Sequence, residues 1–194
     1  MRTNAAIREA AVRLFYAHGY KATSIRAIAN EVGIQVSSIY NHINSKDELL
    51  AEIMLSVMDE LLDSANAVLD GVVGGAPERL KAIIDFHIRY HAEHAREVFI
   101  GNSELRSLSG GDLEKVLARR VEYEQLLIQL VDDLAKNTGA DVLDAKMQAY
   151  SILAQGAHVA SWYKPQGSKS LDDTVEIYIT MTLRQLGIDG RALR

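Results

Sequence analysis

The sequence contains no cysteine and only 2 prolines among its 194 residues. The absence of cysteine excludes a disulfide scaffold, a cysteine-ligated zinc or iron–sulfur site and thiol chemistry. No apolar run approaches the ~18 residues that a membrane-spanning helix needs. The N-terminal fifteen residues carry an acid, Glu9, and lack the unbroken apolar stretch of a signal peptide. We therefore expect a cytoplasmic protein that does not associate with a membrane.

Charge is spread unevenly along the chain. Residues 1–50 hold six Lys or Arg and four Asp or Glu, a net charge of +2. The whole chain has a formal net charge of −5, which leaves −7 for residues 51–194. The overall acidity argues against a nonspecific nucleic-acid coat. A small positive N-terminal end can still contact DNA, because charges are screened beyond about 8 Å.

Helical periodicity dominates the sequence, and no convincing strand or repeat is present. Apolar residues recur at helical spacing and stop at glycine or proline signals, with capping boxes at Ser45 and Glu48 and at Ser170 and Asp173. The pattern predicts an all-α fold of about nine helices. The expected helices cover residues 5–18, 25–33, 35–43 and 46–70, one from 77 whose stripe reaches His91, a shorter stretch reaching 108, and 113–139, 141–163 and 170–186.

Two of the predicted short helices, 25–33 and 35–43, are joined by a tight turn at Gly33, which suggests a helix-turn-helix. Ala29 supplies the small residue that two crossing helices need. Short or planar polar side chains on the second helix are of the kind that reads base edges and phosphates. The predicted DNA-contacting residues are Thr23, Ser24, Gln35, Val36, Ser37, Ser38, Tyr40, Asn41, His42 and Lys46.

Three of these assignments have a plain structural alternative. Tyr40 and Thr23 can donate hydroxyls to phosphates, but Tyr40 could instead pack in the helix-turn-helix core. Lys46 lies in the first turn of its helix, where its ammonium adds to the positive end of the helix dipole. It could also be a solvated surface lysine. Val36 either contacts a thymine methyl group or is an ordinary exposed valine.

The N-terminal stretch resembles the DNA-binding domain of the TetR family of bacterial repressors. The matching residues are Gly19-Tyr20, Thr23-Ser24-Ile25, Ile28-Ala29, Val32-Gly33, Ile39-Tyr40 and Ser45-Lys46. The chain departs from the family pattern at Val36-Ser37 and Ile43-Asn44, so no operator sequence can be borrowed from a relative. The resemblance implies a DNA-binding domain over 1–46, and an effector-binding and dimerisation domain over 47–194.

The predicted helix 141–163 is apolar nearly all round from residue 149, so it must be buried on both sides. It is either the central core helix of a monomer or a helix shared between the core and a partner subunit. In the TetR family the last two helices form a four-helix bundle with those of the partner. The resemblance therefore implies a homodimer interface at Leu153, Gly156, Ala157, Ala160, Val175, Tyr178, Ile179 and Thr182.

His87, His91 and His94 follow a spacing of four and three residues, which puts them near one face of a helix. They could begin a metal site, but no further ligand is evident, so we expect no metal. We interpret them as pocket-lining or core polar groups, with ordinary surface histidines as the alternative. Arg119 and Arg120 either bind an anionic ligand or pair with Glu122 and Glu124 on the helix surface. The predicted effector-binding residues are Phe86, His87, Tyr90, His91, Phe99, Arg120, Tyr123, Leu127 and Trp162.

Residues 104–108 and 162–165 resemble TetR-type regulators of lipid, sterol and acyl-CoA breakdown. The sequence thus favours a ligand-responsive repressor that binds a near-palindromic operator on double-stranded DNA as a homodimer. A small apolar or acyl-CoA-like effector would release it. The alternative is a constitutive DNA-binding protein without an effector. No G-x-S-x-G motif or phosphate loop is present, so we expect neither an enzyme nor a cofactor.

Overall fold

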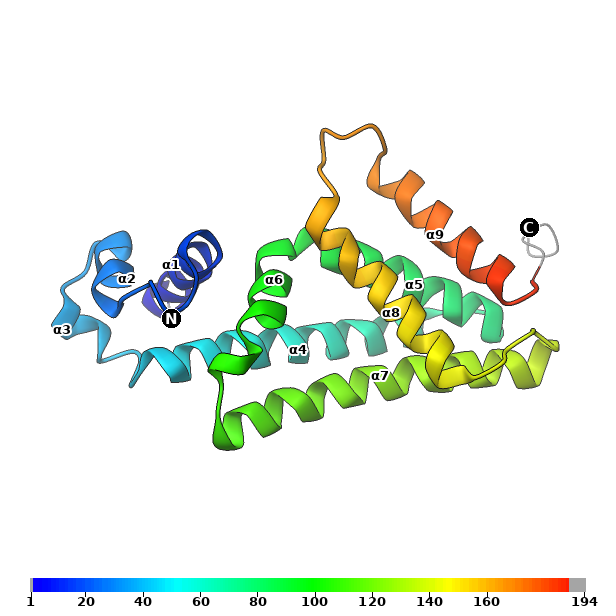
Figure 1. The fold of residues 1–194 in the computed structure, drawn as a ribbon, viewed down its shortest axis with the longest axis horizontal. Helices are drawn as coiled ribbons and strands as arrows, with labels where there is room; N and C mark the ends of the chain where they lie inside the picture. Colours follow the sequence, from blue (N-terminus) through cyan, green and yellow to red (C-terminus); the bar gives the residue numbers. More distant parts are fainter. Residues whose placement is uncertain (1, 189–194) are drawn as a thin grey trace. The chain divides into compact units, whose positions relative to one another are not determined.

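The structure is a computed structural model that describes residues 2–188, with side chains from residue 3 onward (Figure 1). This part of the chain contains nine α-helices, one short 3₁₀ helix and no strand, which confirms the predicted all-α fold. None of these helices is long and apolar enough to cross a membrane. The helices are α1 (Arg2–His18), α2 (Ile25–Val32), α3 (Val36–Ile39), α4 (Lys46–Gly71), α5 (Ala76–Glu93), α6 (Ala95–Ser103), the 3₁₀ helix η1 (Leu105–Ser107), α7 (Gly110–Thr138), α8 (Ala145–Trp162) and α9 (Leu171–Gln185).

Capping residues explain where several helices begin and end. Gly33 ends α2 in the left-handed conformation at φ 75°, which a residue with a side chain rarely adopts. Ser170 and Asp173 form the predicted reciprocal capping box of α9. Four boundaries differ from expectation by three or four residues, and two of these are the starts of α1 and α7, which begin earlier, at Arg2 and Gly110. Helix α8 begins at Ala145 because Asp144 accepts the N–H of Met147 at 2.8 Å, and α3 is a single turn followed by a turn segment.

The chain divides into two compact units. Unit 1 contains residues up to Asp59 together with Arg96–Arg119, and unit 2 contains Glu60–Ala95 and the described residues from Arg120 onward. Helices α4 and α7 each contribute one part to each unit. These units describe packing. The functional boundary expected between residues 46 and 47 remains a prediction.

Unit 1 is built around the helix-turn-helix, in which α1 packs on α2 and α2 on α3. Its core contains the fully buried Phe15, Ile28, Ile39 and Leu50. The same core includes residues from later in the chain: Ile100 of α6, Leu108 before α7, and Val116 of α7. The core of unit 1 therefore depends on residues far along the chain.

Unit 2 is built around α5, which packs against both α8 and α9 (Figure 1). Glu78 caps the start of α5 by accepting the N–H of Gly75 at 2.9 Å. One stripe of α5 is buried and mixes aliphatic residues with two histidines: Leu80, Ile83, Ile84, His87, Ile88 and His91. Polar groups thus enter the interior of this unit.

Candidate functional site

The turn between α2 and α3 presents a row of exposed polar side chains. Ser24 caps α2 by accepting the N–H of Ala27 at 3.1 Å, and Gln35 precedes α3 without using its amide in a cap. Tyr40 is 54% exposed, so it does not pack in the helix-turn-helix core. Of the ten predicted DNA-contacting residues, the structure exposes six: Ser24, Gln35, Ser37, Tyr40, Asn41 and His42. The half-buried Val36 packs against the core of unit 1, and Ser38 is also half-buried.

Thr23 and Lys46 are placed differently from expectation. Thr23 is only 3% exposed, and its hydroxyl donates to the carbonyl oxygen of Gly19 at 2.9 Å. Its single proton is therefore used inside the protein, which corrects the expectation that it faces a phosphate. The ammonium of Lys46 donates to the carbonyl oxygens of Tyr20 and Thr23, both at 2.9 Å. Lys46 is half-buried, and two of its three N–H groups fix the loop that precedes α2.

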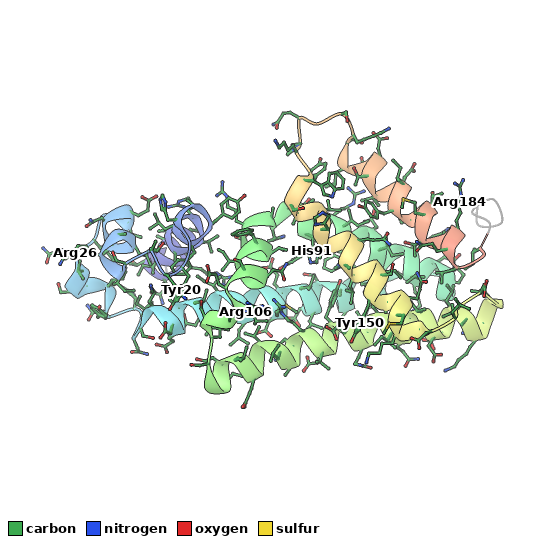
Figure 2. All side chains as sticks on the ribbon, in the orientation of Figure 1. Tyr20, Arg26, His91, Arg106, Tyr150 and Arg184 are labelled. Carbon is green, nitrogen blue, oxygen red and sulfur yellow. The ribbon has the colours of Figure 1, made fainter. Side chains whose placement is uncertain are left out.

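Tyr20 stands at the centre of this arrangement, and Figure 2 labels it on unit 1. Its hydroxyl donates to the carboxylate of Asp47, and its N–H donates to Oε1 of Glu104 at 3.3 Å. The Lys46 ammonium lies 4.2 Å from the centre of its ring. Burial, followed by the hydrogen bond and negative charge of Asp47, raises the pKa of Tyr20. We call Tyr20, Lys46, Asp47 and Glu104 the Tyr20 cluster.

Sequence reasoning missed the roles of Tyr20 and Glu104. Tyr20 was visible only as part of the family pattern. Glu104 lies 84 residues further along the chain, so no local spacing could relate the two. The hydroxyl of Ser107 holds the second carboxylate oxygen of Glu104 at 3.0 Å. The spacing of three residues between Glu104 and Ser107 was the one feature of the local sequence that could have indicated a fixed Glu104 side chain.

The predicted effector residues His87 and Tyr123 meet in the interior of unit 2. The Tyr123 hydroxyl lies 3.0 Å from Nδ1 of His87, and Nε2 of the same ring lies 3.1 Å from the carbonyl oxygen of Leu153. His87 therefore joins α5 to α7 and α8. Burial holds the pKa of His87 well below its usual range and raises that of Tyr123.

His91 continues this polar line one turn further along α5. Its Nδ1 lies 2.7 Å from the carbonyl oxygen of His87, and the two rings are 4.1 Å apart. Burial lowers the pKa of His91 to about 4. We call His87, His91, Tyr123 and the Leu153 carbonyl the histidine network.

His94 is bound to the carbonyl oxygen of Tyr90 through Nδ1 at 2.9 Å, and its ring stacks on that of Tyr90. Its Nε2 lies 3.7 Å from Glu60. The three histidines therefore each turn a nitrogen to a different carbonyl oxygen. Within residues 2–188, no group of three His, Cys, Asp or Glu residues is arranged to hold a metal ion.

The remaining predicted effector residues do not form one cluster. Phe86 and Tyr90 line an open groove of about 370 Å³ with Val68, Arg89 and neighbouring residues of α5. Leu127 is fully buried in the core. Trp162 is 44% exposed at the last residue of α8.

The prediction that Phe99 binds the effector together with the other residues is wrong. Phe99 belongs to unit 1, where it is half exposed and lies edge-on against Tyr16 at 5.2 Å. It is therefore not part of the polar and aromatic interior of unit 2.

The arginine pair is likewise split. Arg119 forms an ion pair with Asp59 at 2.8 Å. Burial lowers the pKa of Arg120, and the charge of Glu124 opposes this shift. The two neighbouring arginines thus lie in different surroundings.

Three predicted dimer residues are already buried within one protomer. Gly156 faces His87, and a Cβ added there would lie 2.2 Å from Cδ2 of that ring. Val175 and Thr182 are buried on α9. The structure accounts for these three residues without a partner, whereas Leu153, Ala157, Ala160, Tyr178 and Ile179 remain partly accessible.

Larger apolar side chains on α8 and α9 are left exposed, and apart from Trp162 none of them was among the predicted site residues. They are Met147, Tyr150, Trp162, Ile177 and Met181. These residues lie on the face of α8 or α9 that is opposite the buried stripe. They could be recognised as exposed only after the buried stripe of each helix was known. An amphipathic assignment was not possible from sequence because α8 is apolar on both faces.

Comparison with known proteins decides the family. Residues 7–53 match the family described as "Bacterial regulatory proteins, tetR family". Residues 73–186, more than half of the chain, match "Tetracyclin repressor-like, C-terminal domain". The chain belongs to the TetR family. This confirms the resemblance seen in the N-terminal sequence and extends it to the C-terminal helices.

Relatives that match along most of the chain are transcriptional regulators, and several of them are named as repressors. The HTH-type transcriptional repressor KstR2 of Rhodococcus jostii is 27% identical over 178 residues, which cover 89% of this chain and 85% of the relative. A tetR-family regulatory protein from Rhodococcus RHA1 has a TM-score of 0.89 at 25% identity, covering 97% of this chain and 99% of that one. The protein is thus a TetR-type transcriptional repressor and not an enzyme.

A further solved structure shows a related protein with its ligands. AibR in complex with isovaleryl coenzyme A and operator DNA has a TM-score of 0.84 at 26% identity, covering 92% of this chain and 97% of that one. This chain is therefore similar in fold to a regulator that was captured with an acyl-CoA.

Proposed function

We propose that this TetR-type repressor binds a near-palindromic operator as a homodimer in the cytoplasm and is released by a small apolar or acyl-CoA-like effector. The observation that carries the DNA-binding part is the exposed polar row at α2 and α3. These side chains are outside the core of unit 1, while the Tyr20 cluster holds the loop before α2 in place.

Within that row, two kinds of contact are expected. Gln35 and Asn41 have amide groups that can pair with base edges, so they would set sequence preference. Tyr40 can donate its exposed hydroxyl to a phosphate. Lys46 is half-buried and lies outside the row, but it retains one N–H for the same purpose. These contacts would position the protein without distinguishing bases.

Dimerisation is supported by the exposed apolar side chains of α8 and α9. Tyr150, Ile177 and Met181 are between 37% and 45% exposed, although they lie on helices whose other face is buried. A second copy of the same surface would cover them. One helix-turn-helix reads only a few base pairs, so two half-sites are needed for specific binding.

An effector site in unit 2 is supported by its polar interior and by the ligand named for AibR. The histidine network places neutral hydrogen-bonding groups among the apolar residues of α5, α7 and α8. Such a mixture is typical of pockets that bind small apolar molecules. Helix α4 supplies residues to both units, so we propose that it transmits the effect of the ligand to the DNA-reading part.

Selection from random double-stranded DNA, followed by fluorescence anisotropy, tests this function. We expect a near-palindromic site, a dimer in sedimentation at micromolar concentration, and weaker operator binding when isovaleryl-CoA or longer acyl-CoAs are added. A coupling of about 1–3 kcal/mol would lower operator affinity 5–150-fold. Operator affinity that no acyl-CoA changes would favour the alternative, a constitutive DNA-binding protein. A monomer would contradict the proposal.

A further inference from the structure

The protons of the histidine network are fixed by backbone carbonyls. A carbonyl oxygen can only accept a hydrogen bond, so the ring nitrogen facing it must carry the proton. For His87 this is Nε2, which faces the Leu153 carbonyl at 3.1 Å. Its Nδ1 is then the acceptor for the Tyr123 hydroxyl at 3.0 Å. Both nitrogens of His87 are therefore satisfied within the protein.

The same argument gives His91 the opposite tautomer. Its Nδ1 faces the His87 carbonyl at 2.7 Å and must carry the proton. A neutral imidazole has one proton, so Nε2 of His91 presents a lone pair and no hydrogen. Burial keeps this ring neutral, because it lowers the pKa of His91 to about 4.

Nε2 of His91 has no hydrogen-bond partner among residues 2–188, unlike both nitrogens of His87. Yet every buried side-chain nitrogen and oxygen in this part of the chain that is closed to solvent has a partner. Nε2 must therefore touch accessible space, although His91 as a whole is only 7% exposed. His91 lies one turn beyond His87 along α5, and both belong to the buried residues of that helix.

We propose that Nε2 of His91 is a hydrogen-bond acceptor in the effector site, and that it selects ligands bearing a neutral donor, a hydroxyl or an amide N–H, on an apolar body. This rests on the proposed effector function and names the ligand chemistry of that site. A carboxylate has no proton to donate, so its oxygens would face the lone pair of Nε2. Inside a poorly solvated site it would also lose the hydration of its charge. The geometry therefore favours amides, alcohols and amide-bearing esters over free acids.

The tautomer is measured first, on the DNA-free protein. Nitrogen-15 NMR of histidine-labelled protein at pH 7 should show a protonated Nδ1 and an unprotonated Nε2 for His91, with the signals assigned by their absence from His91→Phe. A proton on Nε2, or a cationic ring, would overturn the proposal.

Three probes of equal chain length then distinguish the effect of a hydrogen-bond donor on binding from the effect of a negative charge. Octanamide is neutral and has a donor, methyl octanoate is neutral without one, and octanoate is charged without one. Calorimetric titration should show octanamide binding about five- to tenfold more tightly than methyl octanoate, the size expected for one hydrogen bond. Octanoate should bind most weakly.

The variant His91→Phe keeps a ring of similar size and removes the acceptor. The advantage of octanamide should disappear in it, whereas His18→Phe, which changes an exposed histidine at the end of α1, should keep the wild-type order. Octanoate binding as tightly as octanamide, no binding of octanamide up to its solubility limit, or an unchanged preference in His91→Phe would each overturn the proposal.

This experiment is separate from the test of the proposed function because it uses no DNA. If octanamide is preferred but no ligand alters operator affinity, the proposed function fails and the binding preference stands. If free carboxylates bind most tightly and release the operator, the role of His91 fails and the proposed function stands.

Discussion

The two units hold their polar groups together by different means. In unit 1 the Tyr20 cluster uses charged partners: an ammonium from Lys46 and carboxylates from Asp47 and Glu104 surround one tyrosine. In unit 2 the histidine network uses neutral groups, two buried imidazoles, a phenol and a backbone carbonyl. The surface that we propose for DNA binding is thus fixed by ion-assisted bonds, and the interior that we propose for an apolar ligand is fixed without charge.

This difference predicts which conditions affect each unit. Neutral buried histidines are sensitive to acid, because the unfolded chain binds protons that the folded chain does not. Contacts between cations and phosphates are sensitive to salt. The following experiments test this contrast, beginning with the largest expected effect.

Lowering the pH should reduce the free energy of unfolding of unit 2 by more than any single substitution at the surface does. The pKa of His87 and His91 is lowered in the folded state, whereas an unfolded histidine has a pKa of about 6.5. The unfolded chain therefore binds more protons below that pH, and stability falls as the pH drops from 6.5 toward 4. The expected loss is about 2 kcal/mol per histidine by pH 5, measured by urea unfolding across this range.

A variant isolates the contribution of one histidine. In His91→Phe the dependence of unfolding free energy on pH between 5 and 6.5 should be shallower by about one proton, or roughly 1.4 kcal/mol per pH unit. The exposed His158 serves as the control, and the change of slope in His91→Phe is compared with that in His158→Phe. An equal pH dependence in wild type and His91→Phe would mean that His91 is not held neutral.

The sequence predicted unit 1 better than unit 2, and the reason is the range of the interactions. A capping serine at Ser24, a left-handed glycine at Gly33 and small residues at helix crossings act over a few residues, so their spacing is readable. The contact between Gly156 and His87, and that between Tyr20 and Glu104, join residues 69 and 84 positions apart. No local pattern encodes such pairs.

The same limit explains the errors in the candidate sites. The apolar sequence of α8 predicted that this helix is buried. It did not predict which face of the helix packs against α5. Gly156 was therefore assigned to a partner, although it makes room for His87 in its own chain. The inward hydroxyl of Thr23 was missed because a threonine that donates to a backbone carbonyl oxygen and a threonine that donates to a phosphate look alike in sequence.

Gly156→Ala should test whether the close approach of α5 and α8 is required. The added Cβ would lie 2.2 Å from His87, which forces the ring or the helix to shift. Overpacking of this kind costs about 1–3 kcal/mol, despite the gain in helix propensity. We expect a lower melting temperature by thermal unfolding, and a new environment for the His87 ring in NMR.

The matched control is Gly111→Ala in the first turn of α7, where a Cβ meets nothing within 4 Å. Alanine is the better helix former by up to about 1 kcal/mol, so this variant should melt at the same or a higher temperature. If both variants behave alike, His87 does not need the space that Gly156 leaves.

Changes in the exposed row of unit 1 should affect DNA binding with little effect on unit 2. Lys46→Ala should weaken binding to all sequences, about tenfold at low salt, and reduce the salt dependence by about one unit. Tyr40→Phe should also weaken all sequences alike. Asn41→Ala or Gln35→Ala should instead change the preferred bases, as read by selection from random DNA. If affinity and salt dependence are unchanged in Lys46→Ala, Lys46 does not contact DNA and only binds the carbonyl oxygens of Tyr20 and Thr23.

The smallest effect is expected at Glu104, and it separates geometry from charge. Removing a carboxylate near DNA should strengthen binding to a polyanion if charge alone matters. If Glu104 instead positions Tyr20 by accepting its N–H, Glu104→Ala should weaken operator binding about three- to tenfold, the size of one lost hydrogen bond. Glu104→Gln removes the charge but keeps an oxygen that can accept the N–H, so it should bind at least as tightly as the wild type. Anisotropy at fixed salt measures all three proteins, and slower amide exchange at Tyr20 in the wild type than in Glu104→Ala would show the bond directly. Tighter binding by both variants would show that Glu104 acts only through its charge.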